Sequence, residues 1–195
     1  MSYCWLLLNG ISKRSVILYQ ALSINVGNYQ ALLLLVMKII IMRHGQASYF
    51  GADRVLTAEG RQEAELTALK LASHAHITKV YASPKTRAQQ TAQAVVSRLP
   101  GRRLNIITEQ ALTPAGDPFI AVEQALLDAK ENDEMLLISH IPLVEHLSHY
   151  LCPSLEIPLF VTAAALIVAQ KDGKWHPEAF ITPHGEHFFD AARSL

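Results

Sequence analysis

The sequence contains only two cysteines, and Cys4 and Cys152 lie far apart in the chain. Two distant cysteines provide neither a disulfide framework nor the ligand spacing of a zinc site, which agrees with a reducing compartment. The chain also lacks a net charge, because 17 basic residues are matched by 17 acidic ones. It therefore lacks the overall field that attracts nucleic acid or an anionic membrane. We expect a cytoplasmic protein that binds neither.

Acidic residues are absent from the first part of the chain, because residues 1–36 contain Lys13 and Arg14 but no Asp or Glu. These two cations follow an apolar stretch, whereas the basic residues of a signal peptide precede one. Polar side chains interrupt the apolar residues that come next, whereas a membrane anchor needs about 20 mostly apolar residues. Three interpretations stay open: a start of translation at Met37, a poorly ordered extension, and a targeting or membrane segment. We favour the first two and assign the folded domain to residues 37–195.

Apolar periodicity and turn residues predict an alternation of strands and helices after Met37. We expect strands at residues 38–42, 77–81, 103–108, 134–139, 164–170 and 175–181. We expect helices at residues 58–73, 84–98, 118–130 and 141–151. Ser83 and Asp117 are the predicted N-caps of the second and third helices, each followed by proline. This order is typical of an α/β fold, and we predict a three-layer α/β/α sandwich around a mostly parallel sheet.

Cation-forming side chains gather where three of the expected strands end. The first strand ends in Arg43, His44 and Gly45, the second leads to Arg87, and the fourth is followed by His140. Ligands of open α/β sheets bind beyond the carboxyl ends of the strands. Guanidinium groups match phosphate oxygens in pairs, and an oxyanion relieves the repulsion among the cations. The pattern therefore predicts a phosphate site in which Gly45 permits a sharp turn beside the ligand.

One histidine of this set is expected to do more than bind. A neutral imidazole can attack phosphorus and form a covalent phospho-enzyme. His44 lies beside Arg43 on the tightest segment, so it is the better candidate nucleophile. His140 is then expected to donate to the phosphoryl oxygens together with Arg43 and Arg87. Surface arginines and a helix-capping His140 are the competing structural interpretations.

The motifs resemble a known signature. Arg-His-Gly, Ser-Pro-x-x-Arg and a late Ser-His, each at the end of an expected strand, are typical of the histidine phosphatase superfamily, which also includes phosphoglycerate mutases. Residues 112–117 and 138–144, with the Leu-Cys-Pro that follows, are similar to the SixA-type phosphohistidine phosphatases. The resemblance covers residues 38–183, which is nearly the whole expected domain.

The resemblance implies that His44 accepts the phosphoryl group and that Arg43, Arg87 and His140 hold it, without a metal or an organic cofactor. Superfamily members that act on small metabolites usually carry a helical cap inserted between the last two of these residues. Here ordinary elements account for residues 88–139, so we predict no cap and a shallow, open pocket. Such a pocket suits phosphohistidine on another protein. The resemblance suggests a histidine-phosphotransfer domain or a phosphocarrier as partner, and we expect a monomeric enzyme.

One position departs from the family. Where SixA-type sequences tend to have a glutamate, this chain has Ala111, and Glu109 and Asp117 are the nearest carboxylates that could act as a general acid. For Asp117, capping of the helix that starts at Pro118 is the favoured interpretation. A missing acid disfavours ester hydrolysis most, because an alkoxide is a poorer leaving group than imidazole. A broad phosphomonoesterase and a non-catalytic phosphate-binding module stay open as alternative functions.

Overall fold

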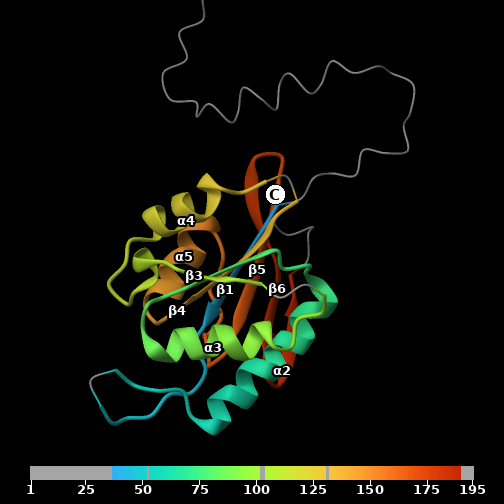
Figure 1. The fold of residues 1–195 in the computed structure, drawn as a ribbon. Helices are drawn as coiled ribbons and strands as arrows, with labels where there is room; N and C mark the ends of the chain where they lie inside the picture. Colours follow the sequence, from blue (N-terminus) through green and yellow to red (C-terminus); the bar gives the residue numbers. More distant parts are fainter. Residues whose placement is uncertain (1–36, 52, 102–103, 131, 190–195) are drawn as a thin grey trace, which may run out of the picture. The chain divides into compact units, whose positions relative to one another are not determined.

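The computed structural model describes residues 37–51, 53–101, 104–130 and 132–189. The interpretations of residues 1–36 lie outside these residues. In the described part of the chain, a seven-stranded sheet lies between two pairs of α-helices, as Figure 1 shows. The predicted α/β/α sandwich is therefore confirmed. None of its helices combines the length and the apolar character that crossing a membrane requires.

The sheet is mixed, and the three strands whose carboxyl ends carry the predicted site residues lie in its parallel half. Its strand order is β3-β2-β4-β1-β5-β6-β7, in which β3, β2, β4 and β1 run parallel and β5, β6 and β7 continue the sheet in antiparallel fashion. The strands are β1 (Lys38–Arg43), β2 (Lys79–Ala82), β3 (Ile106–Thr108), β4 (Glu134–Ser139), β5 (Ala165–Lys171), β6 (Lys174–Thr182) and β7 (Gly185–Phe188). The first six were predicted, whereas β7 was not, so the antiparallel part is larger than expected.

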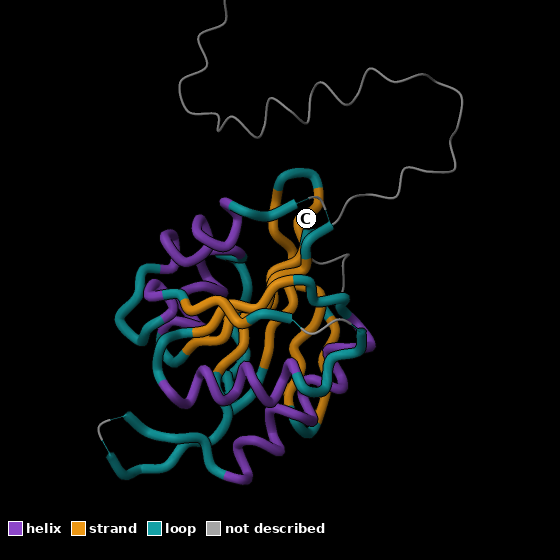
Figure 2. Tube along the Cα trace, viewed as in Figure 1, coloured by secondary structure: helices purple, strands orange, loops and turns teal. Residues whose placement is uncertain are grey.

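The helices cover the two faces of the sheet in pairs. They are α2 (Ala58–His74), α3 (Thr86–Val96), α4 (Pro118–Leu127) and α5 (Leu143–Leu151), with a short 3₁₀ helix, η2 (Gln110–Leu112), before α4. Figure 2 shows the orange strands between these purple helices. On one face, Ile40 and Met42 of β1 pack with buried residues of α2 and α3. On the other face, Ile39 and Ile41 pack with α4 and α5. Successive side chains of β1 point to opposite faces of the sheet, so this one strand contributes to the hydrophobic core on each face.

The start of α3 differs from the prediction. Its N-cap is Lys85 rather than Ser83, and the Lys85 side chain makes no capping hydrogen bond. Instead, the Asp53 carboxylate accepts hydrogen bonds from the backbone N–H and the hydroxyl of Thr86. A carboxylate stabilises the first turn of a helix wherever in the sequence it comes from. The cap is thus supplied by a loop residue 33 positions upstream, beyond the reach of local capping patterns.

Candidate active site

The sheet brings the three predicted strand ends together. β4 lies between β1 and β2, with Arg43 paired to Ser139 and Ala82 paired to Ile138. His44 therefore lies next to His140, and their ring centroids are 5.0 Å apart. The first turn of α3 adds Arg87, whose Nε–H donates to Nε2 of His44 at 3.1 Å.

His44 is held in one tautomer by its neighbours. Its Nδ1 lies 2.7 Å from the carbonyl oxygen of Gly45. A carbonyl only accepts, so Nδ1 carries the hydrogen and Nε2 keeps its lone pair. The hydrogen bond from Arg87 to Nε2 agrees with this assignment. The atom with the lone pair is therefore the one that faces the arginine.

Burial lowers the pKa of His44 from 6.5 to about 4; the hydrogen bond to Gly45 opposes this shift, and the charges of Arg87, Arg43 and Arg54 add to it. The ring is therefore neutral at neutral pH. Because the environment disfavours the imidazolium, we expect an NMR titration of the His44 ring protons to have its midpoint near pH 4 rather than 6.5. Any chemistry that needs the Nε2 lone pair should persist above this midpoint and fail below it. His44→Gln identifies the resonance, and a midpoint near 6.5 would contradict the arrangement.

His140 is buried and uncharged. Burial is the main reason that its pKa is lowered to about 3; His44, in its protonated form, and the cations Arg87, Lys85 and Arg43 lower it further. Its Nε2 lies 2.8 Å from the hydroxyl oxygen of Ser83. When that hydroxyl donates to Nε2, the hydrogen of the ring is on Nδ1, which is buried and has no hydrogen-bond partner. His140 can thus donate one hydrogen bond to a ligand.

Arg43 is fixed by the chain segment that precedes β5. One of its terminal nitrogens donates to the carbonyl oxygen of Phe160 at 2.7 Å, while its Nε is buried without a partner. Burial lowers the pKa of Arg43, and the carboxylates of Glu63 and Glu145 act in the opposite direction. Burial likewise lowers the pKa of Arg87. Both groups are partly stripped of water, which strengthens their interaction with an anion.

Close backbone approach explains the glycine of the first motif. A Cβ atom on Gly45 would lie 2.3 Å from the carbonyl oxygen of Gly60, and one on Gly60 would lie 2.1 Å from that of Gln46. The Gly45 N–H also donates to the Thr91 hydroxyl of α3 at 3.1 Å. The turn after β1 is therefore clamped between α2 and α3. This contact, rather than a positive φ, is what requires glycine here.

A third arginine, Arg54, was not predicted from the sequence. The charge of Arg54 contributes to lowering the pKa values of His44, Arg43 and Arg87, for which burial is the largest cause, so Arg54 adds to the positive field at this site. Its Nε is buried without a partner, and its guanidinium carbon lies 5.7 Å from the centre of the Tyr49 ring. The neighbouring Asp53 ties this loop to α3. Glu63, which was not predicted either, accepts from the backbone N–H of Gln46 and from the hydroxyl of Thr162, each at 2.8 Å.

The two candidate acids are engaged as helix caps. Asp117 accepts from the N–H groups of Phe119 and Ile120 at the start of α4, which confirms the predicted capping role. Glu109 accepts from the N–H of Ala111 at the start of η2. Among the described residues, no group of three or more His, Cys, Asp and Glu side chains is placed to hold a metal ion.

The cluster has the properties of an oxyanion site. Among the described residues, four buried side-chain nitrogen or oxygen atoms lack a hydrogen-bond partner, and three of them are Arg43 Nε, Arg54 Nε and His140 Nδ1. A buried donor without a partner costs roughly 1–3 kcal/mol. An oxyanion accepts hydrogen bonds from donors of this kind and neutralises arginine charges. The geometry therefore suits a phosphoryl group with a neutral imidazole beside it.

Comparison with known proteins agrees with this geometry. Residues 39–113 match the histidine phosphatase superfamily (branch 1). The phosphohistidine phosphatase SixA of Escherichia coli (strain K12) is 37% identical over 139 residues, which cover 66% of this chain and 82% of that protein. A solved structure of the protein histidine phosphatase SixA, complexed with tungstate, matches with a TM-score of 0.68 at 32% identity, covering 76% of this chain and 98% of its own.

A more distant structure shares the fold. The putative phosphohistidine phosphatase SixA from Agrobacterium tumefaciens matches with a TM-score of 0.55 at 21% identity, covering 74% of this chain and 96% of its own. The identity to the Escherichia coli protein and the share of it that is covered are high enough to assign the family. The chain belongs to the histidine phosphatase superfamily and, as a homologue of SixA, is a hydrolase with phosphatase function.

Proposed function

We propose that the protein hydrolyses phosphohistidine on another protein through a covalent phosphohistidine formed on His44. One observation carries the proposal: Nε2 of His44 keeps its lone pair and accepts from Arg87, and the adjacent Arg43 and the neighbouring His140 each have a buried donor without a partner. A bound phosphoryl group would meet a nucleophile and its oxygen ligands at one place. The tungstate of the related SixA structure is a tetrahedral oxyanion of the same kind.

The reaction would proceed in two in-line steps. In the first, the Nε2 lone pair of His44 attacks phosphorus, and the P–N bond to the partner's histidine breaks. When the other nitrogen of that ring is protonated, the ring leaves as neutral imidazole, and no enzyme carboxylic acid is needed. In the second, water attacks phosphorus, the bond to His44 Nε2 breaks, and inorganic phosphate leaves. Throughout, Arg43, Arg87 and His140 would stabilise the charge on the phosphoryl oxygens, which is the main demand of this chemistry.

The carboxylates support phosphohistidine over phosphate esters. Position 111, where SixA-type sequences tend to have glutamate, is alanine, and Glu109 and Asp117 are both occupied as caps. Cleavage of an ester needs a proton donor for the leaving oxygen. The set of side chains at hand therefore fits a leaving group that departs as a neutral base.

The partner and the setting follow from the same proposal. We propose a monomeric cytoplasmic enzyme whose domain begins at residue 37 and whose partner is a histidine-phosphotransfer domain or a phosphocarrier. The described residues between Arg87 and His140 form the rest of α3, then β3, η2, α4 and β4, without an inserted helical cap. An uncapped site leaves room for a phosphorylated side chain presented by a protein surface.

A panel of substrates tests the function. Histidine-phosphotransfer domains and phosphocarriers labelled on their histidines are incubated with the full chain, alongside p-nitrophenyl phosphate. We expect the label to be lost as inorganic phosphate at least about a hundredfold faster than the ester is cleaved, because the ester lacks its proton donor. Brisk ester hydrolysis with stable protein labels would indicate a phosphomonoesterase instead. Binding of phosphate without turnover of any substrate would indicate a binding module.

A further inference from the structure

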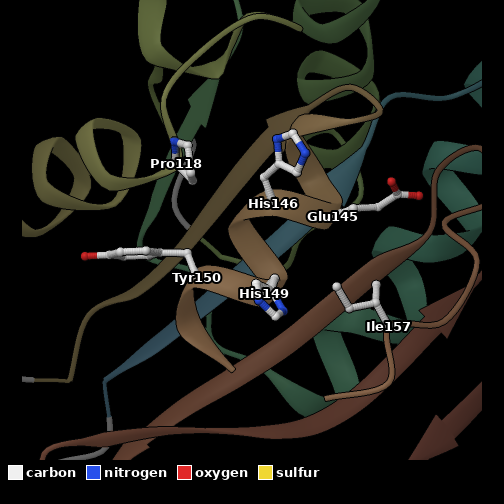
Figure 3. A pocket seen from close by; sticks show the side chains of 6 residues that line it. All are labelled: Pro118, Glu145, His146, His149, Tyr150 and Ile157. Carbon is white, nitrogen blue, oxygen red and sulfur yellow. The ribbon is translucent and has the colours of Figure 1, made fainter. Parts of the chain in front are cut away.

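A shallow groove runs along the exposed face of α5. It has a volume of about 480 Å³. Figure 3 shows Pro118 and Ile157 on opposite sides of α5. The groove is lined by Pro118 of α4, by Glu145, His146, His149 and Tyr150 of α5, and by Ile157. Residues three and four apart share a face of a helix, so the four α5 side chains form its floor. We call this feature the α5 groove.

Both sides of the α5 groove lead to the candidate active site. α5 begins at Leu143, just after His140, and Glu145 in its first turn is close enough to Arg43 to affect its pKa. On the other side, the segment that contains Ile157 continues to Phe160, whose carbonyl oxygen accepts from Arg43 at 2.7 Å. A molecule that reaches the phosphate pocket from this side therefore lies over the groove.

Exposed apolar side chains surround the groove. At its far end, the Phe119 ring is 54% exposed and contacts the Tyr150 ring edge to face, with the centroids 6.1 Å apart. Leu159, two residues after Ile157 in the chain, is 75% exposed, and Ile141, just before α5, is 37% exposed. Apolar and aromatic side chains that gather on a surface in this way are typical of protein interfaces.

The shape and charge of the groove restrict what it can bind. A small molecule would find an open surface with few converging polar groups. An extended strand would find no partner, because the backbone groups of α5 are bonded within the helix. A second helix packs through side chains alone. Of the lining side chains, Glu145 is acidic, His146 and His149 are imidazoles, and none is lysine or arginine; Asp117 directly precedes Pro118 of the lining. An apolar and basic helix face complements it.

We propose that the α5 groove binds a helix of the phosphorylated partner protein, the same helix that presents the phosphohistidine to His44. This inference rests on the proposed function and adds the partner's surface to it. With nine residues, α5 is roughly 14 Å long, so it faces two to three turns of the bound helix. Those turns carry apolar side chains toward Tyr150 and Ile157 and a basic one toward Glu145.

Steady-state kinetics with two substrates test the groove. The full chain is assayed with a phosphorylated histidine-phosphotransfer domain and with phosphoramidate, which has the P–N bond but no protein surface. Tyr150→Ala and His149→Lys are each expected to raise KM for the protein about tenfold while kcat and phosphoramidate hydrolysis stay within about twofold. Leu69→Ala, on the exposed side of α2, is the matched control and should change neither.

Three results would overturn the proposed role of the α5 groove. An unchanged KM for the protein in both variants would overturn the groove, as would a parallel loss of phosphoramidate hydrolysis, which would place these residues in support of the active site. Weaker self-association of Tyr150→Ala with an unchanged KM would assign the groove to a second copy of the chain and overturn the partner helix. If the wild type cleaves phosphoramidate but no protein phosphohistidine, the proposed function fails and the groove proposal fails with it.

Discussion

Replacing His44 with alanine is expected to lower phosphohistidine hydrolysis by a factor on the order of 10⁴ or more, with little change in fold. The imidazole would form and break the bond to phosphorus in both steps, and removal of such a nucleophile costs factors of this size in other enzymes. Neither Arg87 nor His140 can take over, because the arginine holds its charge and His140 Nε2 is bonded to Ser83. The His44→Ala variant is therefore expected to bind the phosphorylated partner without hydrolysing it.

Denaturing mass spectrometry makes this prediction specific. After brief exposure to a phosphorylated partner, wild-type chain should gain one phosphoryl group on His44, in an acid-labile form. His44→Ala should gain none, while His184→Ala, an exposed matched control, should gain it like the wild type. A phosphoryl group on another residue, or an His44→Ala variant that keeps more than about a tenth of the activity, would contradict the covalent route.

The sequence predicted the site through the parallel half of the sheet. Arg43, His44 and His140 directly follow or end β1 and β4, and parallel strands that are neighbours place such residues at one edge. Their convergence requires β2, β4 and β1 to be neighbours, which was a condition of the prediction and which the order of the sheet satisfies. The observed 3.1 Å contact between Arg87 and His44 is the detail that only the structure supplies.

The missed residues share a physical reason. Arg54 lies in the loop before α2, where no periodicity relates sequence position to direction in space. Its position is set by Asp53, which caps α3 through a contact across a long stretch of sequence. Glu63 lies within α2, and its role depends on Gln46 and Thr162, which are far from it in the chain. Local patterns predict elements, whereas these contacts are products of tertiary packing.

The error at β7 has a similar origin. Its sequence, Gly-Glu-His-Phe, has no apolar alternation, and three of its four residues are exposed. An edge strand of this kind is formed by pairing with β6, where Thr182 and Gly185 begin the register. Hydrophobic periodicity identifies strands that bury a face, so it finds β1 and β4 and passes over β7.

Replacing Arg87 with alanine is expected to lower kcat/KM for phosphohistidine by about 10²–10³-fold, the usual cost of losing one donor to a developing oxyanion. Its role is double. In the free enzyme its Nε–H donates to Nε2 of His44, and its charge helps to lower the pKa of His44 after burial. With substrate bound, the Arg87 guanidinium would donate to the phosphoryl oxygens instead and leave the Nε2 lone pair of His44 free for attack. Both roles need a planar group with several donors.

Arg87→Lys separates charge from geometry. A lysine keeps the positive charge but offers a single ammonium group, which cannot reproduce the fork. We therefore expect kcat/KM of Arg87→Lys to be no more than about tenfold higher than that of Arg87→Ala. Arg61 is an exposed arginine of α2, and its replacement in Arg61→Ala should leave kcat/KM as in the wild type. Full recovery by lysine would show that charge alone suffices at this position. An unchanged rate in Arg87→Ala would instead move the phosphoryl-binding role to Arg43 and Arg54, the two arginines whose Nε atoms are buried without a partner.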